Sequence, residues 1–322
     1  MSGTAWTLTG ITQERSLPIE IQVGGRLWAI TFSAKGKYIV SGDDEGVRVW
    51  RTDDGKQMAT MKTGTVNCLA ASKDGKLIAV GTSTGKLVVL DSQTYATVFV
   101  HETHHSLYGV DFSPTSMHLV TPSVSGCAVV WDATTGKQAQ ILLHQFAVTA
   151  AKYSPLGDRI ATATQHAVQV WDSDDGCLLV DINVKVVPLF NTGLVWYRNS
   201  HLLVVSNGKI GKLDATTGAT VLEWPAPDID QFTCVTLPTR DEFFACSSRR
   251  AVILMDASTH TQLPTIRHAQ KISAIALSPD DRFLAIGGDG GKITVKSLPR
   301  IVVSDIPHRS SLHRIQYLLT GT

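Results

Sequence analysis

The residues of this sequence with the clearest chemical potential are HETHH, at positions 101–105. On a helix, the H-E-x-x-H pattern sets two imidazoles one turn apart, so that both can reach a single zinc ion. On a strand, the same two histidines lie roughly 13 Å apart and cannot easily share an ion. The choice between a zinc hydrolase and a chance match therefore depends on the backbone that carries this stretch.

Other catalytic patterns give little support to an enzyme. The sequence contains neither G-x-x-x-x-G-K-[ST] nor G-x-S-x-G, so a phosphate-binding loop and a nucleophile elbow are unsupported. The carboxylate pairs Asp43-Asp44 and Asp53-Asp54 fall in expected turns, where Asp accepts hydrogen bonds from its own backbone. We therefore expect no enzyme activity, no cofactor and no catalytic metal.

Composition and charge narrow the class of protein further. The chain has 322 residues, 43% of them hydrophobic, and a net charge of +1. That balance favours neither nucleic acid nor an anionic membrane as a partner. Five scattered cysteines without a C-x-x-C pair make a poor disulfide or zinc framework. With no signal peptide and no long apolar span, we expect a soluble protein of the cytoplasm, with the nucleus as the alternative.

A repeat runs along the chain, and its structural unit must position the residues of any functional site. A short phrase such as VRVWRTDDG or AVVWDATTG recurs every 40 to 42 residues. Its anchor residues are Trp50, Leu90, Trp131, Trp171, Leu213, Met255 and Lys296. Five anchors are followed by aspartate, at Asp91, Asp132, Asp172, Asp214 and Asp256. Seven copies of one structural unit account for most of the chain.

A second phrase keeps the same spacing and ends at Ser33, Ser72, Ser113, Ser154 and Ser278. Four residues before each serine lies a small residue, as a crowded innermost strand requires. Each unit reads as three or four short apolar strands separated by turn residues, and helical periodicity is hard to find. A small sheet of this kind cannot bury both of its faces alone, so the copies must pack on one another. The sequence predicts an all-β propeller.

The pairs Trp131-Asp132 and Trp171-Asp172, together with the seven-fold spacing, resemble the WD-repeat (WD40) family of β-propellers. The resemblance implies one propeller over residues 1–322, with repeats from about 26 to 306. We expect seven four-stranded blades. Residues 1–25 would include a ring-closing strand at 17–22, although 301–306 competes for that role. Residues 307–322 would be a C-terminal extension or an extra strand, and a partial eighth blade is the alternative.

The repeats are degenerate. Typical family repeats carry a hydrogen-bonded tetrad of His, Ser/Thr, Asp and Trp. His144 and His268 lie at the family's spacing before their serines, and Asp44 lies six residues before Trp50, but no repeat has a complete tetrad. We therefore expect apolar packing and strand hydrogen bonds to hold the blades together.

The repeat also predicts where HETHH lies within its structural unit. It follows the outer-strand sequence ATVFV and precedes the inner-strand sequence LYGVDFS, so it falls in the connecting loop, where the family usually has histidine. No third ligand motif follows it. We therefore interpret the zinc signature as a coincidence.

The resemblance implies a non-catalytic scaffold that presents the rim of the ring to partner proteins of unknown identity. The candidate rim residues are Arg26, Trp28, Asn67, His104, His105, Tyr108, Phe146, Arg249 and Arg250. Aromatic and arginine side chains dominate interface energetics, although such residues can also merely pack between blades. Arg249 and Arg250 leave a phosphoinositide-binding propeller as an alternative, despite a poor match to that motif. We expect a monomer or a component of a larger complex.

Overall fold

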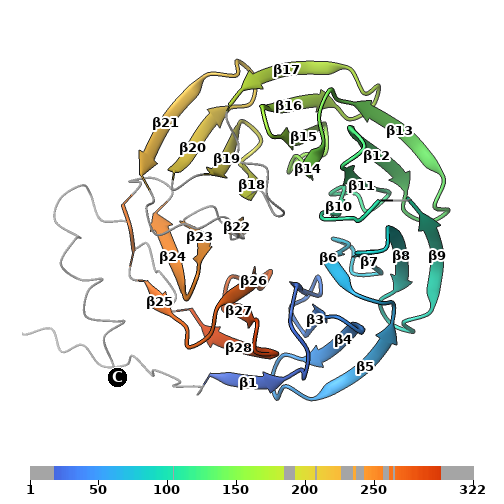
Figure 1. The fold of residues 1–322 in the computed structure, drawn as a ribbon, viewed down its shortest axis with the longest axis vertical. Coiled ribbons are helices and arrows are strands. Elements are labelled where there is room, and N and C mark those ends of the chain that lie inside the picture. The colour runs from blue at the N-terminus through green and yellow to red at the C-terminus, as the bar shows by residue number, and fades with distance from the viewer. Residues whose placement is uncertain are drawn as a thin grey trace, which may run out of the picture.

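The structure is a computed structural model that describes residues 18–103, 105–184, 193–206, 209–225, 235–236, 243–256, 261–263 and 265–298. Every regular element in these ranges is a β-strand, and the strands form seven antiparallel sheets of four (Figure 1). The sheets are the blades of a closed ring, so the predicted all-β propeller with seven blades is confirmed. None of the described residues forms a helix long and apolar enough to cross a membrane.

Each blade runs from an inner strand beside the central channel to an outer strand at the perimeter. Blade 1 contains β2 (Ala29–Phe32), β3 (Tyr38–Gly42), β4 (Gly46–Arg51) and β5 (Gln57–Lys62). Blade 2 contains β6 (Val66–Ala71), β7 (Leu77–Thr82), β8 (Lys86–Asp91) and β9 (Thr97–Glu102). Blade 3 contains β10 (Asp111–Phe112), β11 (His118–Ser123), β12 (Cys127–Asp132) and β13 (Gln138–Leu143). Blade 4 contains β14 (Val148–Tyr153), β15 (Arg159–Thr164), β16 (Ala167–Asp172) and β17 (Leu178–Asn183).

Blades 5 and 6 follow the same order. Blade 5 contains β18 (Gly193–Tyr197), β19 (His201–Ser206), β20 (Lys209–Asp214) and β21 (Thr220–Pro225). Blade 6 contains β22 (Val235–Thr236), β23 (Phe243–Ser248), β24 (Ala251–Asp256) and β25 (Ile266–Arg267). All seven blades occur at the repeat spacing read from the sequence.

The last blade closes the ring with both ends of the chain. It contains β26 (Ile272–Leu277), β27 (Phe283–Gly288) and β28 (Lys292–Ser297), and its outer strand is β1 (Ile19–Gln22). The strands β1 and β28 are antiparallel, with Ile21 opposite Ile293. The predicted closure by an N-terminal strand is therefore confirmed, whereas residues 301–306 and 307–322 lie outside the described residues.

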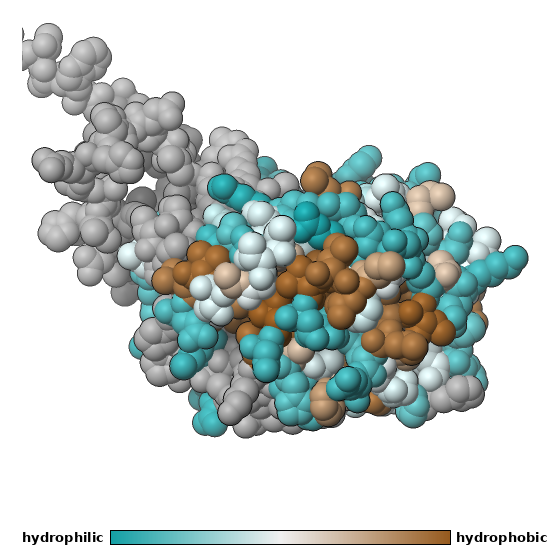
Figure 2. Space-filling model, turned by 90° about the horizontal axis from the view of Figure 1, so that it is seen from above, coloured by the Kyte–Doolittle hydropathy of each residue, from teal (hydrophilic) through white to brown (hydrophobic). Residues whose placement is uncertain are grey.

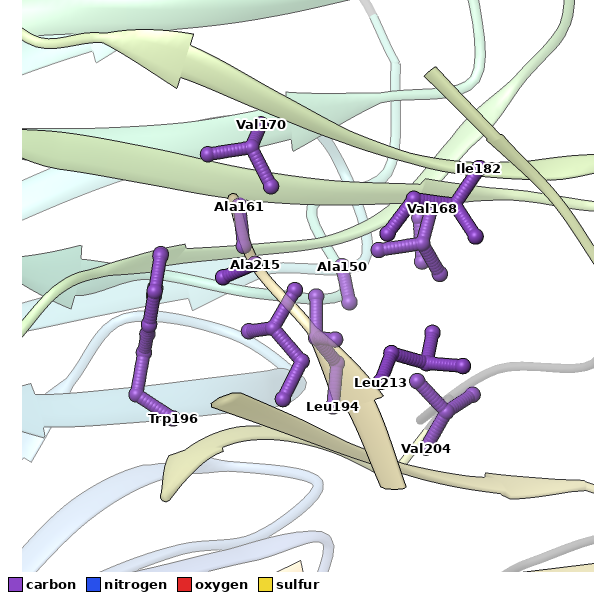
Figure 3. Close-up of a cluster of buried hydrophobic side chains, with 12 residues drawn as sticks. Ala150, Ala161, Val168, Val170, Ile182, Leu194, Trp196, Val204, Leu213 and Ala215 are labelled. Atoms are coloured by element: carbon purple, nitrogen blue, oxygen red, sulfur yellow. The ribbon is translucent and has the colours of Figure 1, made fainter. Parts of the chain in front are cut away.

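Apolar packing between neighbouring blades forms the core. Between blades 4 and 5, Val168 and Ile182 face Leu194, Trp196 and Leu213 (Figure 3). Apolar residues alternate with polar ones along some strands and form continuous runs along others, because a neighbouring blade covers each face of a blade. The expectation that packing between blades carries the fold agrees with these buried clusters.

The aspartate that follows five of the anchors has a structural role where its turn is described. Asp132 Oδ1 accepts backbone N–H bonds from Thr134 (3.0 Å) and Thr135 (2.7 Å), which closes the turn to the outer strand. The backbone bond from Thr135, followed by the side-chain bonds from Thr134 and Thr135, holds the pKa of Asp132 well below its usual value. Asp172 and Asp214 accept the same pair of bonds in their turns. The Trp-Asp repeat therefore encodes a buried strand end followed by a self-capped turn.

Part of the family tetrad survives in blade 4. Trp171 Nε1 donates to Thr162 Oγ1 (2.8 Å), and His144 Nε2 lies 2.8 Å from the same oxygen. His144 Nδ1 lies 2.9 Å from the carbonyl oxygen of Leu142, to which it must donate. Trp50 and Trp131 keep only the bond to a hydroxyl, on Ser41 and Thr121 respectively. No described blade completes the tetrad.

The outer edge of the ring is partly apolar. Figure 2 shows apolar patches along the edge that carries β13, β17 and β21. The exposed apolar side chains on these strands are Ile141, Leu143, Leu178, Leu179 and Val221. The edge strands therefore lack the mostly charged outer face that often protects such strands.

Candidate functional site

Two kinds of loop meet on one side of the ring. The loop from the outer strand of one blade to the inner strand of the next lies beside the turn between the second and third strands. Backbone bonds join them: Val66 donates to Asp43 (2.9 Å) and Leu107 donates to Thr82 (3.1 Å). We call this side the upper face, and the opposite side, with the remaining turns, the lower face.

The candidate rim residues that the structure describes all belong to the upper face. Trp28, Tyr108 and Phe146 precede inner strands, as predicted, and Asn67 lies at the start of β6. His104 lies outside the described residues. These residues share a face because successive strands of a blade run in opposite directions, so equivalent loops lie on the same side. Lying on one face does not by itself make them a single site.

A hollow of about 350 Å³ opens on this face beside the mouth of the central channel. It is the candidate functional site. Its lining residues are Arg26, Trp28, Thr65, Asn67, Ser83, Tyr108, Lys271, Ile272, Ser273 and Asp289. The structure thus brings together four of the candidate rim residues, from blades far apart in the sequence.

Hydrogen bonds and stacking fix the aromatic wall of the hollow. The guanidinium carbon of Arg26 lies 3.9 Å from the centroid of the Trp28 ring, a cation–π contact. Arg26 Nε also forms an ion pair with Asp289 Oδ1 (3.1 Å). On its other edge, Trp28 Nε1 donates to Asp44 Oδ1 (2.7 Å). The indole ring is therefore held in one orientation before any partner binds.

The contacts of Asp44 differ from those expected of a tetrad aspartate. Its spacing to Trp50 matched the aspartate of the family tetrad, but its carboxylate accepts from Trp28 on the upper face. Its neighbour Asp43 is buried, accepts backbone bonds from Glu45 (2.9 Å) and Gly46 (3.0 Å), and forms an ion pair with Arg48. The Asp43-Asp44 pair therefore builds a turn and orients an aromatic side chain.

Two positions of the repeat line the hollow. Trp28, Asn67, Tyr108 and Ser273 each come directly before the small residue of an inner strand. Arg26, Thr65 and Lys271 each lie two residues earlier. The sequence analysis missed the other six lining residues, which are Thr65, Ser83, Lys271, Ile272, Ser273 and Asp289. Extending both repeat positions to every blade would have found three of these six.

The other candidate rim residues lie elsewhere on the upper face. Phe146 packs against the ring of His166, with centroids 4.3 Å apart. Arg249 and Arg250 form the turn between β23 and β24, where their carbonyl oxygens accept from Ile272 and His268 (2.8 Å each). Neither they nor His105 line the hollow.

The described residues of the HETHH stretch, 101–103 and 105, do not lie on a helix. His101 and Glu102 are the last residues of β9, so the strand extends further than the predicted boundary between strand and loop. The His101 ring lies 4.3 Å from the ring of Trp131, centroid to centroid. Among the described residues, no group of three His, Cys, Asp or Glu side chains is placed to hold a metal ion.

The chemistry of the hollow suits binding. Its aspartate, Asp289, is paired with Arg26, and its aromatic and hydroxyl groups offer contacts rather than a general base. Below it, Cys68 lines the central channel, and burial raises the pKa of its thiol to about 12. A thiol that stays protonated is a weak nucleophile.

Comparisons with known proteins agree with the architecture. The family "Anaphase-promoting complex subunit 4 WD40 domain" matches residues 39–121, and "WD domain, G-beta repeat" matches 21–51 and 260–295. An uncharacterized WD repeat-containing protein of Schizosaccharomyces pombe is 27% identical over 42% of this chain and 24% of its own length. A U3 small nucleolar RNA-associated protein 15 homolog of Xenopus laevis is 25% identical over 72% of this chain and 46% of its own. The chain thus spans less than half the length of these two relatives.

A solved structure supports the fold alone. A chain of the structure titled "Crystal Structure of Mitotic Checkpoint Complex" matches with a TM-score of 0.76 and 17% sequence identity. The match covers 92% of this chain and 99% of that chain. The similarity therefore extends over the whole ring.

Proposed function

Because the chain belongs to the WD40-repeat family of β-propellers, we propose that it is a non-catalytic scaffold that binds partner proteins at its upper face. The observation that carries this proposal is the hollow between Arg26, Trp28 and Tyr108. Rigid aromatic and arginine side chains around a depression are the usual anchors of a protein interface. The cytoplasm and a role within a larger complex remain part of this proposal.

The charge pattern supports a protein as the ligand. Arg26 is neutralised by Asp289, so the hollow has no excess of positive charge at this pair for nucleic acid. Hydroxyl and amide groups of Thr65, Asn67 and Ser83 can bond the backbone of an inserted segment. The phosphoinositide alternative at Arg249 and Arg250 stays a prediction that liposome flotation can test.

The experiment compares two double variants in affinity capture from the native cell, followed by mass spectrometry. Arg26→Ala with Tyr108→Ala removes two walls of the hollow, and we expect it to lose a defined set of partners. Met117→Ala with Leu156→Ala is the matched control, because both side chains are exposed in lower-face turns. Both variants should keep the wild-type melting temperature. Equal capture by the two variants would remove the upper-face assignment.

A further inference from the structure

One turn of the lower face departs from the repeat. In five blades, the turn from the first to the second strand starts with a serine whose hydroxyl accepts a backbone N–H, as Ser154 does from Arg159 (3.1 Å). Blade 5 has Tyr197 at the end of this strand, directly opposite His201. Its shorter turn includes Arg198, which has a positive φ of 54°. The serine turn that those five blades share therefore does not explain the sequence of this turn.

Three basic side chains surround the ring of Tyr197. Lys212 Nζ lies 4.6 Å from the ring centroid and the Arg198 guanidinium carbon lies 5.4 Å from it. The His201 ring lies 6.4 Å away at 60°. Tyr197 itself is buried between blades 5 and 6, next to Leu203. The packed tyrosine is therefore a fixed aromatic ring with three nitrogen-bearing side chains beside it.

Among the residues that the structure describes, these basic groups have little counter-charge. No carboxylate of the described residues forms an ion pair with Arg198 or Lys212. Burial, and then the charge of Arg198, lower the pKa of Lys212, and burial and then Lys212 lower that of His201. Asp214 opposes the shift at His201, but its carboxylate also accepts two backbone bonds in its own turn. An anion bound beside Arg198, His201 and Lys212 would relieve the repulsion between their positive charges.

We propose that Arg198, His201 and Lys212, around Tyr197, bind the phosphoryl group of a phosphorylated side chain on a partner protein. A phosphoryl group carries nearly two negative charges and three acceptor oxygens, which match a guanidinium, an ammonium and an imidazolium. A carboxylate offers one charge to the same three donors. The site lies on the lower face, so it is separate from the hollow proposed to bind partners.

The surroundings favour a single phosphoryl group over a membrane surface. Binding an anionic bilayer needs a broad basic area. The neighbouring lower-face turns of blade 4 instead carry acidic residues, among them Asp158, Asp174 and Asp175. Asp158 also accepts a hydrogen bond from Asn199, inside the turn of blade 5 (3.1 Å). A flat anionic surface would meet these carboxylates, whereas one phosphorylated side chain would not.

Binding should be linked to protonation of His201. A bound phosphoryl group favours the imidazolium, so it raises the pKa of His201 and the complex takes up a proton. Affinity should therefore increase as the pH falls from about 8 to about 7, a range in which a phosphoryl group with a second pKa of about 6 keeps most of its second charge. This dependence distinguishes the proposed cluster from a pair of lysines or arginines, which would not titrate in that range.

The test uses the full chain and the imidazole resonance of His201 in NMR titrations. The probes are a short peptide with one phosphoserine, the same peptide without phosphate, inorganic phosphate, and phosphoinositide vesicles. We expect the phosphopeptide to shift the resonance and raise the pKa of His201, and we expect the peptide without phosphate to do neither. Lys212→Gln should weaken that binding roughly tenfold, the value of one charge-assisted bond. Lys209→Gln is the matched control on the same strand, since Lys209 is paired with Glu223 (3.8 Å).

Four results would overturn the proposal. The first is no response of His201 to the phosphopeptide. The second is binding of the phosphopeptide no tighter than inorganic phosphate, which would assign the site to free phosphate. The third is a response to vesicles but not to the peptide. The fourth is an equal loss of phosphopeptide affinity in Lys212→Gln and in the control Lys209→Gln. Capture at the upper face is unaffected by any of these results.

Discussion

Arg26 and Asp289 form an ion pair across the seam of the ring, with Nε 3.1 Å from Oδ1. Arg26 follows the closing strand β1, whereas Asp289 lies in the turn between β27 and β28 of the last blade. Lys271 and Ser273 reach the hollow from the same blade. The candidate site is therefore built where the two ends of the chain meet, so closure of the ring and formation of the site are coupled.

Ile21→Ala tests this coupling. Ile21 is 3% exposed and packs with Trp50 and Ile293, so the truncation should cost about 2–5 kcal/mol of unfolding free energy. Partner capture should weaken as well, since Arg26 and Trp28 follow β1 directly. Denaturant titration and affinity capture measure the two effects.

Glu20→Ala is the control for that variant. Glu20 lies on the same strand, is half exposed, and pairs with Lys292 (2.6 Å), so its loss should cost at most about 1 kcal/mol. A cost for Ile21→Ala no larger than that for Glu20→Ala would show that β1 does not hold the ring closed.

Thr162→Val should destabilise blade 4 more than Ser41→Ala destabilises blade 1. The first change leaves both Trp171 and His144 without their hydroxyl partner, whereas the second affects Trp50 alone. Each unsatisfied buried group costs about 1–3 kcal/mol, so the difference should be of that size. Chemical denaturation of the two variants gives the comparison, and equal losses would refute the shared role of Thr162.

The stability of the protein should fall at mildly acidic pH because of His144. Burial lowers the pKa of His144 below its ordinary value of 6.5, against opposing effects of Leu142 and Asp181. Its Nε2 must also stay unprotonated to accept from Thr162 while Nδ1 donates to Leu142. The unfolded chain therefore binds the proton more tightly than the folded one does. This contribution to stability is complete above about pH 6.5 and is lost as the pH falls through and below that value.

Unfolding free energies at about pH 7.5 and about pH 5.5 measure this effect, and His144→Asn should reduce the difference between them. An NMR titration of the wild-type protein reports the pKa of His144 directly. A value above 6.5 would contradict the proposed direction.

Gly136→Ala and Gly64→Ala separate backbone strain from blade packing. Both glycines have positive φ, 70° and 84°, so either substitution should cost about 1 kcal/mol. A Cβ at Gly136 would lie 2.7 Å from the ring of Phe99 in the neighbouring blade, whereas nothing lies within 4 Å at Gly64. The clash should add about 1–3 kcal/mol to Gly136→Ala alone. Similar melting temperatures for the two variants would exclude a tight contact between Phe99 and Gly136.

The fold could be predicted because its causes repeat along the chain. The anchors at Trp131 and Trp171, with their following aspartates, set the blade spacing, and the position of LPIEIQ (17–22) before the first unit predicted the closing strand. The blade-4 bonds were harder to foresee, because Thr162 carries no signal until the pairing of β15 with β16 brings its hydroxyl to Trp171 Nε1. Spacing alone could not show that Asp44 accepts a hydrogen bond from Trp28 on the upper face and takes no part in a tetrad.

Only part of the site could be predicted, for a physical reason. Trp28 and Tyr108 were found because aromatic side chains before inner strands are conspicuous in the sequence. Asp289 was missed because it reaches the hollow only when the last blade closes against the first. Lys271 occupies the same repeat position as Arg26, but the prediction did not extend that position to the last blade. Phe146 precedes an inner strand too, yet it packs on His166 and stays outside the hollow.

Site-specific photo-crosslinking tests the central claim most directly. A benzophenone side chain replaces Tyr108 in one protein and Leu156, which is 75% exposed on the lower face, in another. Irradiation in the native cell should join a partner protein to the chain through position 108 and leave position 156 without that product. The same partner captured only through position 156 would contradict the assignment of the upper face as the binding surface.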